Sequence, residues 1–135
     1  MEKSKVYFTN FRAKPDRNVL QKLRHLIEAA GMTSMPLEGK FTAIKMHFGE
    51  PGNLAFLRPN YAKVVVDTLK DMGARPFLTD CNTLYTGMRR NALDHLTAAF
   101  ENGFGPLQTG CHVIIADGLL GNDHVSVPID GEYCK

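Results

Sequence analysis

Residues 44–53 read Ile-Lys-Met-His-Phe-Gly-Glu-Pro-Gly-Asn, and this stretch decides the fold. Its first half predicts a buried strand, and its second half predicts a loop that contains two glycines. Lys45 and His47 lie inside the predicted strand, although a strand covered on both faces is normally a near-continuous apolar run. A buried charge without a partner is costly. The two ionisable side chains, followed at once by Glu50, therefore indicate a polar site at the mouth of a sheet.

Strands alternate with helices along the rest of the chain. The expected strands are Lys5–Asn10, Phe41–Phe48, Arg75–Thr79 and His112–Ala116. The expected helices run from Pro15 and Asp16 to about Ala30, where Gly31 suits a left-handed cap, and from Pro59 to Gly73, with a third that buries Ala92, Leu93, Leu96 and Phe100 before Gly103. This order predicts a three-layer α/β fold, with a mainly parallel four-stranded sheet and helices on both faces.

The end of the chain predicts a further element. Val125–Ile129 and Glu132–Cys134 flank Asp130-Gly131, a pair that suits a tight turn, so we expect a C-terminal β-hairpin. With 135 residues, the chain is long enough for a single α/β domain. Because it stops soon after a strand-like segment, residues 1–135 are expected to be the amino-terminal portion of a longer protein.

Composition excludes several classes of function. A net charge of +2, without a basic run or a basic helix face, argues against a nucleic-acid partner. No apolar segment approaches the roughly 20 residues that a membrane helix needs, and the start of the chain lacks the apolar core of a signal peptide. The sequence therefore predicts a cytoplasmic protein without a membrane partner. An uncovered sheet edge or hairpin would favour a homodimer.

Polar residues follow the predicted strands. In open α/β sheets, ligands bind beyond the carboxyl ends of the strands. The residues expected there are Asn10, Lys45, His47, Glu50, Asp80, Asn82 and Asp117. Alternation puts Lys45 and His47 on one face of their strand, and Asp80 on the neighbouring strand is the expected partner of Lys45.

These residues are candidates for different roles. Lys45 and His47 are the catalytic candidates. Candidate ligand-binding residues are Glu50, Asn53, Arg58 and Asn82, and candidate ligands of a divalent metal are Asp80, His47 and Glu50. Purely structural alternatives stay open, because His47 could bond a backbone carbonyl and Lys45 could form a plain ion pair.

Other polar residues are given structural readings. Tyr85, Arg89 and Arg90 belong to a polar loop, and His95 is interpreted as a boundary histidine of the third helix. Gly49 and Gly52 match neither the phosphate-binding nor the dinucleotide fingerprint, so they indicate a turn rather than a nucleotide site. Cys81, Cys111 and Cys134 are widely spaced and include no C-x-x-C pair, so they are expected to be structural thiols rather than ligands of zinc or an iron–sulfur cluster.

Three long motifs carry a family resemblance. Residues 43–67 (AIKMHFGEPGNLAFLRPNYAKVVVD), 76–96 (PFLTDCNTLYTGMRRNALDHL) and 110–119 (GCHVIIADGL) resemble the amino-terminal part of the domain of unknown function 362 family. Its members are commonly described as iron–sulfur centre or ferredoxin-like proteins. The resemblance implies further α/β structure and a cysteine region with 4Fe-4S clusters in longer relatives, whereas this chain ends before such cysteines. The positions that match the family motifs are Lys45, His47, Glu50, Arg58, Asp80 and Asn82.

Three functional hypotheses remain open from the sequence. In the first, the domain is redox-associated: it holds a small anionic ligand or a metal at the strand ends, and a cluster in the missing C-terminal region supplies electrons. In the second, a non-redox enzyme uses Lys45 and His47 for proton transfer on an anionic substrate anchored by Arg58, with a divalent metal on Asp80 and Glu50. In the third, the domain is a non-catalytic binding module whose polar residues form internal ion pairs.

Overall fold

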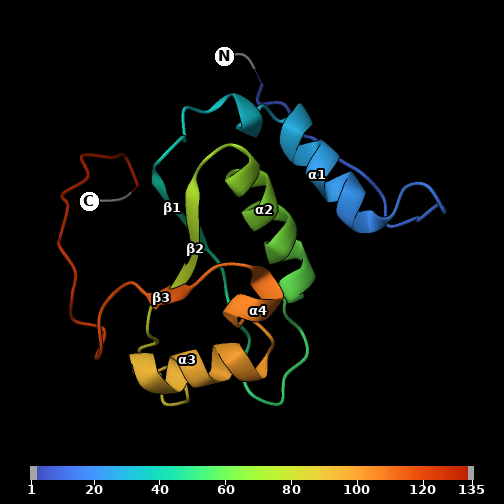
Figure 1. The fold of residues 1–135 in the computed structure, drawn as a ribbon. Coiled ribbons are helices and arrows are strands. Elements are labelled where there is room, and N and C mark those ends of the chain that lie inside the picture. Colours follow the sequence, from blue (N-terminus) through green and yellow to red (C-terminus); the bar gives the residue numbers. More distant parts are fainter. Residues whose placement is uncertain (1–2, 134–135) are drawn as a thin grey trace.

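The computed structural model describes residues 3–133 as an α/β fold built on a parallel sheet (Figure 1). Its elements are α1 (Val19–Ala29), the short 3₁₀ turn η1 (Met32–Ser34), β1 (Phe41–Lys45), α2 (Pro59–Asp71), β2 (Arg75–Asp80), α3 (Ala92–Glu101), α4 (Pro106–Thr109) and β3 (Val113–Ile115). Within the described residues the sheet has three strands in the order β1-β2-β3, and all of them are parallel. The predicted parallel α/β class is confirmed.

The core lies on one face of the sheet. The register places Ile44 of β1 beside Leu78 of β2, and Leu78 beside Val113 of β3. Leu78 is fully buried, and it packs with Val66 of α2 and Phe104, which are also fully buried. These apolar contacts fix α2 on the sheet, and both crossovers, β1–α2–β2 and β2–α3–α4–β3, follow the β-α-β pattern.

Local signals explain where the first two helices begin and end. Asn18 and Gln21 form a reciprocal capping box, so α1 begins at Val19 rather than at Pro15–Asp16 as predicted. A tight turn between Lys14 and Arg17, with two backbone hydrogen bonds of 3.1 Å, occupies the preceding residues. Gly31 has a φ of 86°, which confirms the predicted left-handed cap. The expected start of α2 at Pro59 is also confirmed.

The opposite face of the sheet is open in the part of the chain that the structure describes, so the expected helices on both faces are not found. Phe41 is 72% exposed and Ile114 is 50% exposed on that face. The reason lies in α1, which packs against α2 instead of crossing to the other face (Figure 1). The described fold therefore has two layers where the alternation predicted three.

Two predicted β elements are absent from the described residues. Lys5–Asn10 forms no strand: Val6 is 89% exposed and Phe8 is 84% exposed, because no neighbouring strand pairs with them. Residues 125–133 form no hairpin, and part of the predicted second arm lies outside the described residues. An isolated hairpin is marginal without a surface to pack on, and Pro128 removes one backbone donor. The prediction of a fourth strand and a hairpin is therefore not confirmed.

The buried face of α3 also differs from the predicted one. The helix fully buries His95, Ala98 and Ala99. Of the predicted residues, Ala92 and Leu96 do pack against the core, partly buried, whereas Leu93 is 66% exposed and Phe100 is 49% exposed. The side chain of Phe48, fully buried beneath α3, meets the edge of the His95 ring with centroids 5.8 Å apart. The two alanines leave room for this close approach, so α3 turns its small residues inward. None of the helices within residues 3–133 combines the length and the apolar character needed to span a bilayer.

The loop after β1 depends on Gly49. Its φ is 84°, and a Cβ built there would lie 2.6 Å from Phe56 Cδ1 and 2.7 Å from Asn102 Nδ2. The same Asn102 amide donates a 2.9 Å hydrogen bond to the carbonyl of Phe48. A side chain at position 49 would therefore be strained in its backbone and would collide with the contact that joins the β1 loop to the end of α3.

We predict that Gly49→Ala lowers the free energy of unfolding by about 2–4 kcal/mol, because backbone strain adds to a steric clash. Gly52→Ala is the matched control: its φ is 80°, but nothing lies within 4 Å of the added Cβ. Strain alone should cost the control about 1 kcal/mol. Urea denaturation of both variants measures the difference, and equal losses would contradict this account of Gly49.

Candidate functional site

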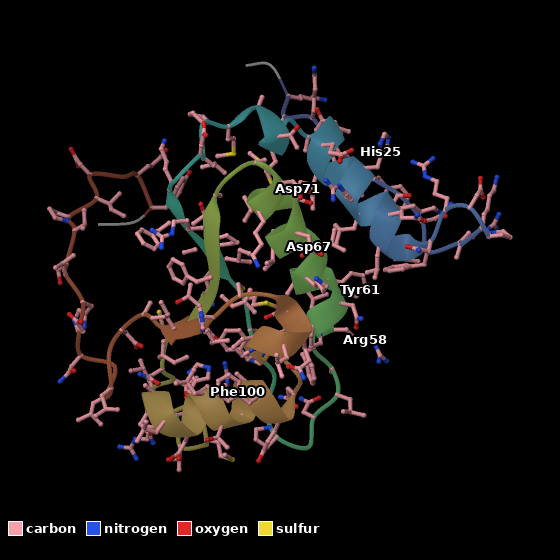
Figure 2. The ribbon with its side chains drawn as sticks, in the orientation of Figure 1. His25, Arg58, Tyr61, Asp67, Asp71 and Phe100 are labelled. Carbon is pink, nitrogen blue, oxygen red and sulfur yellow. The ribbon has the colours of Figure 1, made fainter. Side chains whose placement is uncertain are left out.

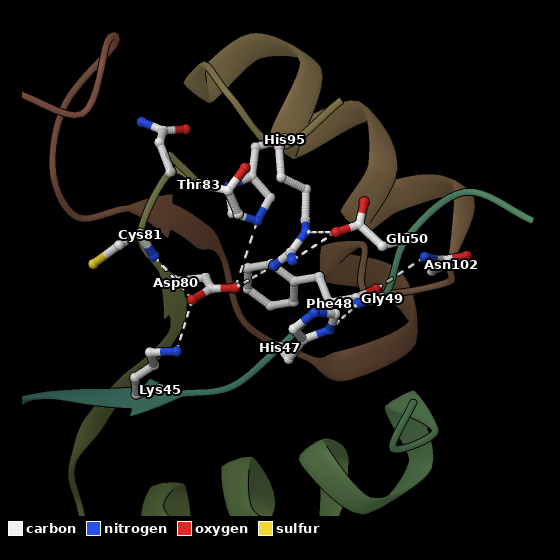
Figure 3. A network of polar contacts seen from close by, with 12 residues as sticks. Lys45, His47, Phe48, Gly49, Glu50, Asp80, Cys81, Thr83, His95 and Asn102 are labelled. Carbon is white, nitrogen blue, oxygen red and sulfur yellow. Dashed lines mark hydrogen bonds and ion pairs between the residues drawn. The ribbon is translucent and has the colours of Figure 1, made fainter. Parts of the chain in front are cut away.

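A polar network lies at the carboxyl ends of β1 and β2, beneath α3 (Figure 3). Its centre is Asp80, the last residue of β2, whose side chain is only 6% exposed. Asp80 Oδ1 lies 2.7 Å from Lys45 Nζ and accepts a 2.9 Å hydrogen bond from the backbone amide of Cys81. The expected pairing of Lys45 with Asp80 is therefore present. It follows from the register, because Lys45 lies beside Thr79 and Asp80 is the next residue of β2.

The second carboxylate oxygen of Asp80 faces two other groups. Arg89 Nη1 lies 3.3 Å from Oδ2, and His95 Nε2 lies 3.6 Å from the same atom. His95 is completely buried. Its distance to Asp80 is longer than a normal hydrogen bond, and within residues 3–133 neither ring nitrogen has a hydrogen-bond partner. Burial of an unsatisfied polar group is costly, so His95 is an unusual feature of this network.

Arg89 joins Asp80 to the loop after β1. Its side chain is 5% exposed, and its Nε and Nη2 lie 2.7 Å and 2.6 Å from Glu50 Oε1. The hydroxyl of Tyr85 donates to the same Glu50 oxygen at 2.6 Å and also accepts a hydrogen bond from Arg89 Nη2. The amide of Thr83 donates to the carbonyl of Arg89 at 2.8 Å, which fixes the loop that carries Tyr85 and Arg89.

The hydrogen bonds and ion pairs of the network keep Glu50 and Asp80 ionised. Hydrogen bonds from Arg89 and then from Tyr85 lower the pKa of Glu50 below its ordinary value. Burial alone raises the pKa of Asp80, but the contacts with His95, Lys45 and the Cys81 amide outweigh it and bring the pKa to about 2. Burial also lowers the pKa of Arg89, yet the Glu50 carboxylate outweighs burial and raises it. Lys45, Arg89, Asp80 and Glu50 thus form a network with balanced charges.

Lys45 and His47 are less buried than predicted. Lys45 and His47 point to the face of the sheet that no described helix covers, and β1 is also the edge strand. The Lys45 side chain is therefore 66% exposed, and His47 is exposed as well. The predicted alternation is confirmed, because Ile44 and Phe48 point into the core. His47 Nδ1 accepts a 2.9 Å hydrogen bond from the amide of Gly49. It therefore bonds a backbone N–H rather than the carbonyl that the structural alternative expected.

Three predicted ligand-binding residues lie apart from the network. Asn53 Oδ1 accepts a 2.9 Å hydrogen bond from the amide of Ala55, which closes a local turn. Arg58 is exposed at the start of α2, where Figure 2 shows its position. Asn82 donates from Nδ2 to Asp117 at 3.1 Å and joins the loops after β2 and β3. Glu50 reaches Asp80 only through Arg89.

Arg89 and His95 are the residues whose place in the site was missed. The sequence places Arg89 among several polar loop residues and His95 at the boundary of a helix face. A signal for His95 was present in the sequence, because Ala98 and Ala99 follow it by three and four residues and mark a helix face that can approach a neighbour closely. For Arg89 the sequence carries no comparable signal, since its partner Glu50 is 39 positions away.

The donor set does not support the expected metal. Asp80 and Glu50 both point their oxygens at Arg89, while His47 bonds Gly49. In the described part of the chain, no group of three or more His, Cys, Asp or Glu side chains has an arrangement that could hold a metal ion. Cys81 is exposed and Cys111 is buried, and Cys134 lies outside the described residues. The described residues therefore do not fit a 4Fe-4S cluster, and the divalent metal stays a prediction without structural support.

The fold and the network define an α/β domain with a polar site at the carboxyl ends of parallel strands. A family model described as "Domain of unknown function (DUF362)" matches residues 42–135, so the chain belongs to this family. The match includes every residue of the network, from Lys45 to His95, and excludes α1. No curated protein and no solved structure matches the chain.

We predict that Arg89→Met lowers the free energy of unfolding by about 3 kcal/mol or more, because it leaves the buried Asp80 and the half-buried Glu50 without their shared cation. Arg24→Met is the matched control. Arg24 also contacts two carboxylates, Asp71 at 2.6 Å and Glu28 at 3.1 Å, but its side chain is 43% exposed. The exposed pairs should contribute about 1 kcal/mol or less. Urea denaturation at neutral pH compares the two, and similar losses would contradict a structural role for Arg89.

We predict that Asp80 makes the free energy of unfolding depend on pH in the acid range. Its pKa is about 2 in the folded protein against an ordinary value of 3.8, so the unfolded chain takes up its proton first as the pH falls. The stabilisation, about 2 kcal/mol, is fully present above roughly pH 4 and is lost as the pH falls towards about 2. Unfolding free energies measured across this window should converge for the wild type and Asp80→Asn. A constant difference between them would show that Asp80 is not the titrating group.

Proposed function

We propose that this domain binds a small anionic ligand at the carboxyl ends of β1 and β2, through Lys45 and His47. It would serve as the ligand-binding part of a redox-associated DUF362 protein. The 4Fe-4S cluster that the resemblance implies would then be ligated outside residues 3–133. The hydrogen bond from the Gly49 amide to His47 Nδ1 is the observation that carries the ligand-binding part.

That hydrogen bond assigns the tautomer of His47. A nitrogen that accepts a hydrogen bond carries no proton, so the neutral imidazole has its proton on Nε2. Nε2 is then a donor on an exposed side chain. Its complement in a ligand is an acceptor such as a carboxylate or phosphate oxygen. The Gly49 amide, 2.9 Å from Nδ1, thereby sets which end of the ring faces outward.

Lys45 supplies the charge. An ammonium has three protons to donate, and Asp80 Oδ1 accepts only one of them at 2.7 Å. The side chain is 66% exposed, so the remaining donors face solvent on the same side of β1 as His47. Figure 3 shows Lys45 and His47 on the same side of the network. Together they present donors and a positive charge to one region of the surface.

The buried network makes this surface rigid. Lys45 is held by Asp80, and Asp80 is held by Arg89 and the Cys81 amide. Because the network is charge-balanced, the Asp80 carboxylate beside Lys45 is already paired, with Lys45 and with the Arg89 that it shares with Glu50, so an approaching anion meets no uncompensated carboxylate. Preorganised donors lose little entropy on binding, which favours affinity for a small ligand.

The same tautomer bears on the proton-transfer hypothesis. With Nδ1 occupied by the Gly49 amide, loss of the Nε2 proton would leave an imidazolate. This tautomer therefore suits His47 to donate a hydrogen bond to a bound anion rather than to transfer a proton. Arg58, the substrate anchor in that hypothesis, lies at the start of α2 and makes no side-chain hydrogen bond or ion pair with the network in the described structure. The hydrogen bond from Gly49 therefore favours ligand binding by His47 over the proton-transfer hypothesis.

Calorimetric titrations with inorganic phosphate and with succinate test the proposal. We predict that at least one probe binds, and that Lys45→Met weakens its binding by about 10-fold or more through loss of a charged hydrogen bond. His47→Gln should weaken binding less, because the amide keeps one donor. Lys63→Met is the matched control, since Lys63 is 49% exposed and pairs with Asp67 at 2.9 Å on α2.

Two results would overturn the ligand-binding part: neither probe binds, or Lys45→Met and Lys63→Met bind equally well. A large loss of stability in Lys45→Met without any lost ligand would favour the binding module with internal ion pairs. The redox part has its own test. The protein at its full native length, purified anaerobically, should show iron–sulfur absorption and electron paramagnetic resonance signals. An iron-free, colourless protein would remove that part and leave the ligand site untouched.

A further inference from the structure

An apolar groove runs along the free edge of the sheet. Its walls come from α1, β1, α2 and the loop before α2, and it encloses about 300 Å³. The apolar residues that line it include Leu23, Ile44, Met46, Leu57, Tyr61 and Val65. Lys45 stands at its rim. Water in such a groove gains few hydrogen bonds, so an apolar occupant of the right shape would be stabilised there.

β1 borders this groove and offers backbone groups for pairing. Within the described residues β1 pairs only with β2, on its inner side. The outer N–H and C=O groups of an edge strand are a template for another extended segment. The groove therefore combines two requirements of a strand-docking surface: apolar side-chain pockets and an unpaired strand edge.

The segment Lys5–Thr9 has the matching chemistry. It reads Lys-Val-Tyr-Phe-Thr, a β-branched and aromatic run. Val6 and Phe8 are 89% and 84% exposed, whereas Tyr7 between them is 45% exposed. Side chains two residues apart point the same way in an extended segment, so Val6 and Phe8 would enter the groove together.

The end of this segment already adjoins the groove. A second apolar hollow, of about 270 Å³, is lined by Thr9, Asn10 and Phe11. Its other walls include Leu23, Leu57 and Tyr61, the same side chains that line the first groove. Lys22 Nζ donates to Asn10 Oδ1 at 3.0 Å and to the Asn10 carbonyl at 3.3 Å. Asn10 is thus tethered to α1, and the residues before it need only pivot about this point.

We infer that residues 5–9 dock in this groove as a strap along β1, with the tethered Asn10 as the pivot. The docked strap pairs in parallel with the outer edge of β1, and α1 becomes the crossover helix of a right-handed β-α-β unit. Figure 1 shows the N-terminal segment running beside α1, so docking moves residues 5–9 from the side of α1 to the outer edge of β1. This inference is independent of the proposed function.

The strap would also border Lys45. Docking covers the side of this residue that lines the groove. It leaves the side that faces His47 open, because His47 lines neither the groove nor the second hollow. The strap is therefore a device that narrows the approach to Lys45 from one side of the sheet.

The structure makes the test sharp, because both key side chains are exposed when the strap is undocked. Replacing an exposed side chain changes stability little, whereas replacing a docked one lowers it. We predict that Val6→Ser and Phe8→Ser each lower the urea midpoint of unfolding. Leu107→Ser is the control, since Leu107 is 96% exposed on α4, and its midpoint should not change.

Hydrogen exchange supplies the second measurement on the same protein. Docking should protect the amides of residues 6–9 and the outer amides of β1 by about 10-fold or more, and Phe8→Ser should remove that protection. Unchanged urea midpoints with exchange at the rate of an unstructured peptide would overturn the inference. Protection that rises with protein concentration would overturn it in favour of a second copy docking at the β1 edge. A hydrophobic dye that binds the groove in Phe8→Ser but not in the wild type would support the docked strap.

Discussion

The guanidinium of Arg89, buried between the carboxylates of Glu50 and Asp80, is the interaction on which the site depends. It joins the loop after β1, the end of β2 and the loop that leads into α3, which are far apart in the sequence. A buried cation with two carboxylate partners tolerates only a narrow range of geometries. The contacts of the Arg89 side chain therefore fix the position of each of these loops. Lys45 and His47 are presented to solvent on the frame that results.

Part of this arrangement follows directly from the sequence. The parallel sheet, the start of α2 and the ion pair between Lys45 and Asp80 all depend on local patterns and on strand register. Parallel strands end at the same edge of a sheet, so polar residues at those ends must lie near each other. Of the seven residues picked on this principle, Lys45, His47, Glu50 and Asp80 lie around one region. Asn82 and Asp117 bond each other instead, and Asn10 is held at α1 by Lys22. Strand register places these residues but does not determine their chemical roles.

The remainder depends on tertiary contacts that periodicity does not encode. Hydrophobicity favours Leu93 and Phe100 as the buried side of α3, yet the side that lies against Phe48 carries His95 and two alanines. Lys5–Asn10 has the composition of a strand, but strand formation requires a partner as well as propensity. Asn53 and Arg58 carry suitable chemical groups, but the chain turns between them and the network. In each case, the missing information is where another part of the chain lies.

The buried imidazole of His95 has a consequence for how this fold balances its energy. Neither ring nitrogen has a hydrogen bond within the described residues, so the side chain costs free energy that a leucine at the same position would not. A sequence optimised for thermal resistance alone would place an aliphatic residue there. The buried ring therefore reduces the domain's margin against unfolding at a position where an apolar side chain of similar size would increase it.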